Sequence, residues 1–186
     1  MATKKRLWKS LKYQGGEIVS YFDQSEWTVG EWRNNPYTVT KACEGLNCCQ
    51  HITDAMGYVR CEILAEVVIR GKQIDEDTKI TVQEMKIIRA WKWSPLDSVA
   101  LAIYAAELVI EHYEQKYPND KRPRNAIDAA KAYLKNPTND SAYAAANAAN
   151  AAANASKQEK EKAREEMKTK IDKWIINHLK GKEQVQ

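Results

Sequence analysis

The feature that most constrains the fold is an alanine-rich tract at residues 141–156. Ten of its residues are alanine, which is the strongest helix former. The exceptions are ordered at steps of four, three and four residues: Tyr143, Asn147, Asn150 and Asn154. On a helix these four side chains lie within roughly 60° of one another. The tract therefore predicts an alanine helix that carries one polar stripe.

The composition is that of an ordinary globular protein. The chain has 186 residues, of which 44% are hydrophobic and 29% are charged. One Phe and seven Gly argue against a β-sandwich or barrel. No apolar run reaches the roughly 18 residues that a membrane span needs, and the basic start lacks the apolar centre of a secretory signal. We therefore expect a cytoplasmic protein with reduced cysteines and no membrane partner.

The first 16 residues form a basic N-terminal arm. This arm holds five cations and no acid before Gly15: Lys4, Lys5, Arg6, Lys9 and Lys12. Residues 17–39 then mix short β-like runs with turn residues, which predicts an irregular or partly β segment.

From about residue 40 the pattern predicts helices. Residues 40–53 and 54–70 are expected to be helical, with Gly71 as the stop. Thr81 and Glu84 have the spacing of a capping box for a further helix. Ser94 and Pro95 open another, which runs to about residue 115.

Two more helices are expected after the basic turn at residues 118–123. The first covers residues 124–135, and the second runs without Gly or Pro from residue 138 to 180. The expected fold is therefore all-α, a helical bundle with an Ala-rich long C-terminal helix. Residues 17–180 would form a single α-helical domain, and residues 181–186 a disordered tail.

The segment Arg122-Pro123-Arg124-Asn125-Ala126-Ile127 carries a family resemblance. It follows an apolar helix and precedes an Asn-Pro turn and the alanine tract with its Tyr and Asn residues. This order resembles the Imm5-like family of immunity proteins, which occurs in bacterial and phage genomes. The likeness covers roughly residues 96–156. It implies a protein that acts against a toxin, and it implies no catalytic residues.

The polar stripe is the candidate partner-binding surface. Asn supplies both hydrogen-bond donors and acceptors without charge, although it is a weaker helix former than Glu or Lys. A protein partner could bind Tyr143 and the three Asn residues, with Arg122 and Arg124 beside the start of the helix. A solvated polar face or an internal hydrogen-bond network are the alternatives.

The basic arm gives a second hypothesis. Its five cations could bind nucleic-acid phosphates, and a solvated terminus is the alternative. A third hypothesis, a zinc-stabilised domain, rests on four cysteines and a histidine: Cys43, Cys48, Cys49, Cys61 and His51. Their spacing matches no common zinc module, so we expect no metal and no cofactor.

No motif indicates an enzyme. The chain lacks Gly-rich phosphate loops, G-x-S-x-G and H-E-x-x-H, and its three histidines are scattered. The sequence therefore predicts a non-enzymatic, protein-binding inhibitor of the immunity or phage counter-defence type. A nucleic-acid-associated accessory protein is the alternative. The long C-terminal helix could also pair two copies of the chain, because its seam ends in Met167, Ile171 and Trp174.

Overall fold

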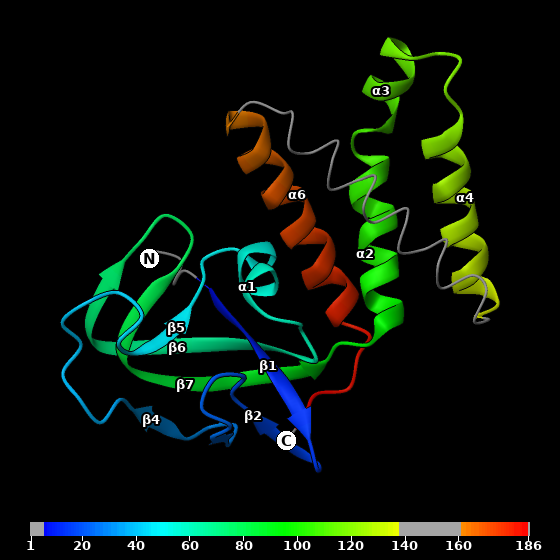
Figure 1. Cartoon of the computed structure of the whole chain (residues 1–186). Coiled ribbons are helices and arrows are strands. Elements are labelled where there is room, and N and C mark those ends of the chain that lie inside the picture. Colours follow the sequence, from blue (N-terminus) through cyan, green and yellow to red (C-terminus); the bar gives the residue numbers. More distant parts are fainter. Residues whose placement is uncertain (1–5, 138–160, 186) are drawn as a thin grey trace. The chain divides into compact units, whose positions relative to one another are not determined.

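The computed structural model describes residues 6–137 and 161–185. The chain divides into two compact units (Figure 1). The sheet unit comprises the chain up to Trp93 and again from Trp174, and the helical unit runs from Ser94 to Lys173. The boundary near the C-terminus therefore falls inside the last helix.

The sheet unit contains a seven-stranded antiparallel sheet within the described residues. Its order is β3-β2-β1-β6-β7-β4, and β5 also pairs with β7. The strands are β1 (Leu7–Gln14), β2 (Glu17–Val19), β3 (Glu26–Trp27), β4 (Trp32–Asn34), β5 (Leu46–Cys48), β6 (Ile63–Asp75) and β7 (Ile80–Lys92).

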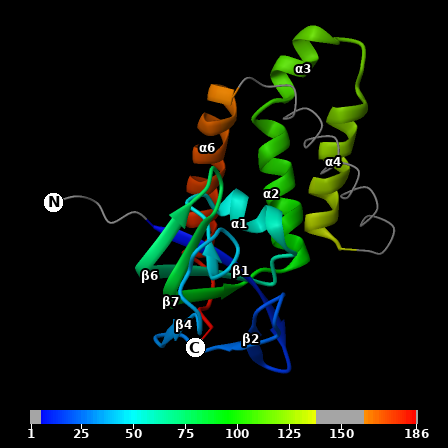
Figure 2. The same ribbon diagram turned by 60° about the vertical axis from the view of Figure 1, so that its left-hand side comes forward.

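The β6–β7 hairpin is the centre of this sheet. Both strands have 13 residues, and they pair from Ile63 opposite Lys92 to Asp75 opposite Ile80 (Figure 2). A bulge interrupts the register between Arg70 and Gln73. Gly71 lies in this bulge with a φ of 80°, a conformation that favours glycine. Gly71 therefore bends a strand and does not end a helix.

The all-α prediction was wrong, and so was the expected run of helices from residue 40 to 70. Within that range the helix is α1 (Ile52–Tyr58), and the apolar run after it is strand β6. The run looked helical because it is apolar on both sides. Residues 63–67 are in fact buried on both faces of the sheet, and a doubly covered strand has the same pattern as a buried helix.

The capping box at Thr81 was also wrong. Thr81 lies in β7 and is fully buried. Its hydroxyl donates to Asn47 Oδ1 over 2.7 Å and accepts from the backbone N–H of Cys43 over 2.9 Å. The side chain therefore ties the loop before β5 to the sheet.

The free edge of β7 is covered by several short segments in succession. β5 pairs with residues 80–82 and β4 with residues 84–86. Farther along, the N–H of Gly30 donates to Ile87 O over 2.8 Å, and the N–H of Val185 donates to Ala90 O over 2.9 Å. This covering leaves little unpaired backbone where another strand could add.

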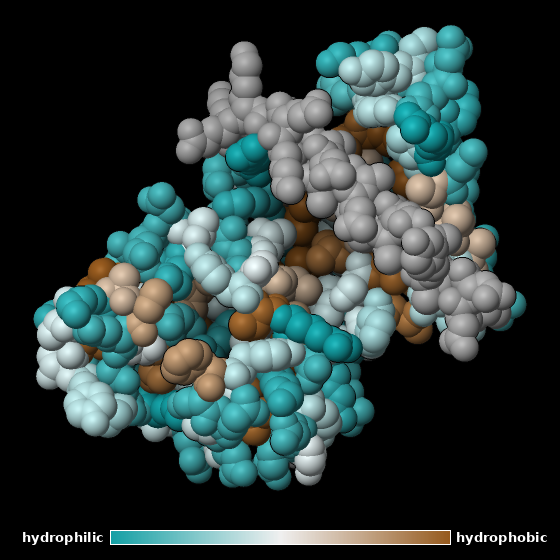
Figure 3. All heavy atoms as spheres, in the orientation of Figure 1, coloured by the Kyte–Doolittle hydropathy of each residue, from teal (hydrophilic) through white to brown (hydrophobic). Residues whose placement is uncertain are grey.

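The sheet unit buries apolar side chains on both faces of its sheet. One face carries a core that includes Leu11, Ile63, Val67, Val82 and Ile87. On the other face α1 packs against β1, and Ile175 and Leu179 near the chain end are buried. The face of this unit seen in Figure 3 is mostly hydrophilic, with small separate hydrophobic patches.

The helical unit contains α2 (Pro95–Glu107), α3 (Ile110–Lys116), α4 (Arg122–Lys135) and most of α6 (Glu161–Leu179). The predicted cap at Ser94 is confirmed, because its side chain accepts from the Asp97 N–H and the Asp97 carboxylate accepts from the Ser94 N–H. The helix expected to reach residue 115 is interrupted at Leu108 and Val109. No helix in the described ranges is long and apolar enough to cross a membrane.

The core of the helical unit joins the first three of these helices. Its buried members are Ile103, Ala106, Ile110, Ile127 and Ala130. The helix predicted over residues 124–135 is confirmed as α4, with Ile127 and Ala130 facing inward. α6 ends at Leu179, close to the predicted stop at Gly181.

Lys9 is a cation placed on the core side of β1. Side chains alternate along a strand, so Lys9 shares a face with the buried Leu7 and Leu11. Its Nζ donates to Asn47 O over 2.9 Å and lies 5.3 Å from the centre of the Trp27 ring. Burial lowers the pKa of Lys9 from 10.5 to about 8.

This burial predicts a stability gain in alkaline solution. Below pH 8 both states hold the proton, and the folded state carries the full cost of the buried charge. Between pH 8 and 10.5 the folded chain releases the Lys9 proton first, so the contribution of Lys9 to the free energy of unfolding rises with pH. We expect Lys9→Met to lack this rise and to be more stable at pH 7 by ~1–3 kcal/mol. Urea titrations from pH 7 to 10 measure both effects. Lys72→Met, at an exposed site on β6, is the control, and an equal pH slope in wild type and Lys9→Met would contradict the expectation.

A second stability prediction concerns Gly45. A Cβ at this position would lie 2.7 Å from Val39 Cγ2 and 2.8 Å from Val82 O, and both neighbours are fully buried. We expect Gly45→Ala to destabilise the protein by ~1–3 kcal/mol, because the core must shift. Gly57→Ala is the control, since no atom lies within 4 Å of its Cβ and alanine favours helix α1. In thermal unfolding, the midpoint of Gly45→Ala should be lower than that of the wild type, whereas the midpoint of Gly57→Ala should not.

Candidate functional site

Arg122 lies at the turn between α3 and α4, where one carboxylate holds it. Asp120 accepts hydrogen bonds from Arg122 Nε over 2.9 Å and Nη2 over 2.7 Å, and from its backbone N–H over 3.1 Å. Tyr113 Oη donates to the same carboxylate over 2.8 Å. These hydrogen bonds hold the pKa of Asp120 well below its usual range, with Arg122 as the largest cause. The Arg122 side chain is nevertheless 88% exposed. The turn therefore presents an arginine whose orientation is fixed before any partner arrives.

Arg124 has a different environment. It donates to Glu114 from Nε over 2.9 Å and from Nη2 over 2.6 Å. This bidentate pair lowers the pKa of Glu114 and fastens α4 to α3. Its side chain is 37% exposed. The structure thus brings the two predicted arginines to one turn and gives Arg124 an internal role.

The rest of the predicted partner-binding surface lies outside the described residues. This applies to Tyr143, Asn147, Asn150 and Asn154. Their role in binding stays a prediction from the sequence.

Residues 7–14 of the basic arm form strand β1. Lys4 and Lys5 lie outside the described residues, and Arg6 precedes β1. Lys9 is turned toward the core, as described above. Lys12 Nζ donates to Gln24 Oε1 over 3.3 Å. Of these cations, Arg6 lines a cleft.

The cleft forms where the pairing of β1, β6 and β7 places side chains on one face of the sheet. Trp8 on β1 lies opposite Glu66 on β6, and Glu66 lies opposite Arg89 on β7. Partners directly across a sheet project from the same face. Trp91, two residues after Arg89, projects from that face as well. One face of three strands therefore carries two indoles and one acid–base pair.

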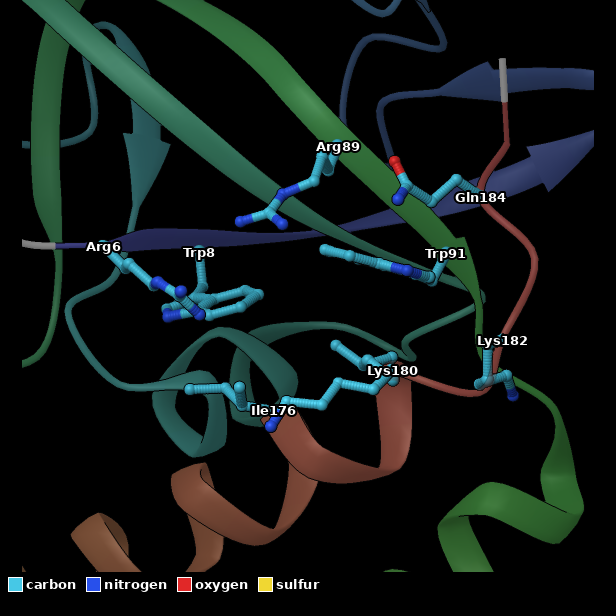
Figure 4. A pocket seen from close by; sticks show the side chains of 9 residues that line it. Arg6, Trp8, Arg89, Trp91, Ile176, Lys180, Lys182 and Gln184 are labelled. Carbon is cyan, nitrogen blue, oxygen red and sulfur yellow. The ribbon is translucent and has the colours of Figure 1, made fainter.

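The cationic cleft has a volume of about 280 Å³. Nine residues line it: Arg6, Trp8, Arg89, Trp91, Ile176, Leu179, Lys180, Lys182 and Gln184. Figure 4 shows Arg6, Trp8, Arg89 and Trp91 on one side, with Ile176 of α6 and Lys180 just after this helix facing them. Each of these residues belongs to the sheet unit.

Glu66 organises the charges of the cleft. Its side chain is only 6% exposed. Arg89 Nη2 lies 2.5 Å from Glu66 Oε2, and Arg6 Nε lies 3.6 Å from Glu66 Oε1. The side chains of Arg89 and Arg6 are 41% and 50% exposed. One buried carboxylate thus orients two arginines whose other N–H groups face solvent.

Two tryptophans form the floor of the cleft. The Trp8 and Trp91 ring centres are 6.4 Å apart, and the guanidinium carbon of Arg89 lies 5.6 Å from the Trp91 centre. Both indoles are almost fully buried. They therefore supply a rigid apolar base beneath the cations.

The sequence predictions did not include this site. Arg89 and Trp91 were placed on a helix, which would have put them on different faces of a different element. The available signal was the alternation along residues 84–87, where Met85 and Ile87 are buried and Glu84 and Lys86 are partly exposed. That alternation favours a strand.

The cysteines lie at several different depths. Cys48 and Cys49 are buried, and burial raises the pKa of the Cys48 thiol to about 12. Cys43 is exposed and accepts a hydrogen bond from Lys79 Nζ over 2.8 Å. Among the described residues, no three His, Cys, Asp or Glu side chains gather as metal ligands.

Two family models match the chain, and they overlap at β7. The Imm-5 like putative immunity protein family matches residues 78–168, which confirms the resemblance seen over residues 96–156. This is an immunity-type family, and the match includes α2, α3 and α4. No curated protein and no solved structure matches the chain. The second model is that of the Domain of unknown function (DUF7666) and matches residues 5–98. Because this match covers just over half of the chain, the protein belongs to the DUF7666 family.

Proposed function

We propose that this protein is a non-enzymatic immunity protein that neutralises a toxin by binding it. The observation that carries the proposal is the family match over residues 78–168, which includes the three helices α2, α3 and α4. A protein of this type requires a stable surface and no catalytic group.

The turn between α3 and α4 supports the proposal physically. Arg122 is exposed and oriented by Asp120, so it loses little side-chain entropy when it binds. Tyr117 beside it is 46% exposed and lies 4.9 Å from the Tyr113 ring, between ring centres. Arg and Tyr are the residue types most enriched at binding hot spots. The turn therefore offers an exposed arginine and a partly exposed tyrosine as candidate anchor residues.

The stripe at Tyr143, Asn147, Asn150 and Asn154 would extend this surface. Its three amides offer paired donors and acceptors, which suit a polar protein surface. An acidic partner surface would in addition complement Arg122.

The test begins with affinity capture from a lysate of the source organism. Each captured protein is expressed alone in a bacterial host and then together with this chain. We expect one captured protein to arrest growth alone and to be harmless in a complex with this chain. If every captured protein is harmless alone, or if its toxicity persists in the presence of the chain, the proposal is wrong.

Charge reversal at the turn provides the matched prediction. Arg122→Glu should weaken the complex by about tenfold or more, because a hot-spot cation becomes an anion. Lys170→Glu, an exposed site on α6 in the same unit, should leave the affinity within about twofold. Isothermal titration calorimetry measures both. The triple substitution of Asn147, Asn150 and Asn154 by Glu tests the stripe separately, and circular dichroism checks that each variant is folded.

A further inference from the structure

We propose that the cationic cleft of the sheet unit binds a nucleoside monophosphate. The proposed toxin binding concerns the helical unit, so this site is independent of it. The argument rests on the charge, the shape and the mixed chemistry of the cleft lining.

The charge of the cleft selects an anion. Arg6 and Arg89 face it from the sheet, and Lys180 and Lys182 line it from the chain end. Glu66 is the acid that contacts both arginines, and it lies beneath them. The nine residues that line the cleft include four cations and no acid, which gives the lining a positive charge. A doubly charged phosphate monoester neutralises more of this charge than a single carboxylate does.

The geometry favours phosphate recognition by arginine. A guanidinium has five N–H donors in a fixed fork. Glu66 contacts Nη2 of Arg89 and Nε of Arg6, so each group keeps further N–H donors, and both side chains are about half exposed. The buried carboxylate holds Arg89 by a hydrogen bond, and Arg6 lies at 3.6 Å from it in a looser ion pair. Two guanidinium groups that pair with one carboxylate suit the three terminal oxygens of a phosphate monoester.

The remaining lining suits the nucleoside part of the ligand. Ile176 and Leu179 add apolar side chains to the cleft lining, and Gln184 supplies an amide. An amide offers both a donor and an acceptor, which can pair with the edge of a base. A volume of about 280 Å³ lies at the lower limit of ligand pockets. It favours one nucleotide unit over a dinucleotide.

The experiment uses the full-length protein and three probes in calorimetric titrations: adenosine monophosphate, adenosine and inorganic phosphate. We expect adenosine monophosphate to bind most tightly, inorganic phosphate more weakly and adenosine not at all. The affinity should fall as salt increases, because the contacts are ionic. Absence of binding by adenosine monophosphate overturns the proposal. Equal affinity for inorganic phosphate overturns the nucleoside part and identifies a plain phosphate site.

Two variants test the location without removing the pair that stabilises the fold. Arg6→Gln and Lys180→Gln both retain the contact between Arg89 and Glu66. Each should weaken adenosine monophosphate binding by about tenfold. Lys72→Gln removes one exposed charge on the same sheet, roughly 20 Å along β6 from Glu66, and should leave binding unchanged. Unaltered binding in both cleft variants, with circular dichroism showing the native fold, would place the ligand elsewhere and overturn the proposal.

Discussion

The pairing of β6 with β7 is the constraint on which the sheet unit depends. These two long strands share one continuous hairpin, and the other strands attach directly or in sequence to its outer edges. β1 adds to β6, and β4, β5 and the chain end add to β7. A shift of β6 by one residue would move Glu66 to the core face, and Ile63, Ala65 and Val67 to the other face. The position of nearly every functional side chain therefore follows from one register.

The buried side chain of Glu66 limits which residues can lie next to it on its face of the sheet. A carboxylate that is 6% exposed requires cationic partners, because an unpaired buried charge costs several kcal/mol. These partners are Arg89 on β7 and Arg6, which directly precedes β1. Their presence is thus explained by stability alone. Both arginine side chains also remain partly exposed, and their charges contribute to the positive charge of the cleft.

The sequence was informative where local chemistry decides structure. Ser94 and Asp97 define a helix start through two short hydrogen bonds, and Ile127 and Ala130 define the inner face of α4 by their spacing. Both features depend on neighbours a few residues away. Strand β6 could not be recognised in this way, because its residues are covered on both faces by elements distant in sequence. Its β-branched content (Ile63, Val67, Val68) was the remaining signal.

The candidate sites also differ in whether their residues are close in sequence or are brought together by the fold. Arg122 and Arg124 were identified because they stand together in the sequence, whereas Arg6, Trp8, Arg89 and Trp91 come together only through strand pairing. Even the distinct roles of Arg122 and Arg124 depend on Asp120 and Glu114, whose positions follow from how α3 turns into α4. A cleft assembled from three strands and a returning helix leaves no contiguous motif.

The C-terminal residues show that this protein is more than two family domains joined in sequence. The DUF7666 match ends at residue 98 and the immunity match at residue 168. Yet Ile176, Leu179 and Lys180 line the cleft, and Val185 bonds to β7. Residues beyond both matches therefore complete the sheet unit. The cleft depends on a segment that neither family match includes, so its ligand specificity can differ between this chain and proteins that share only the DUF7666 region.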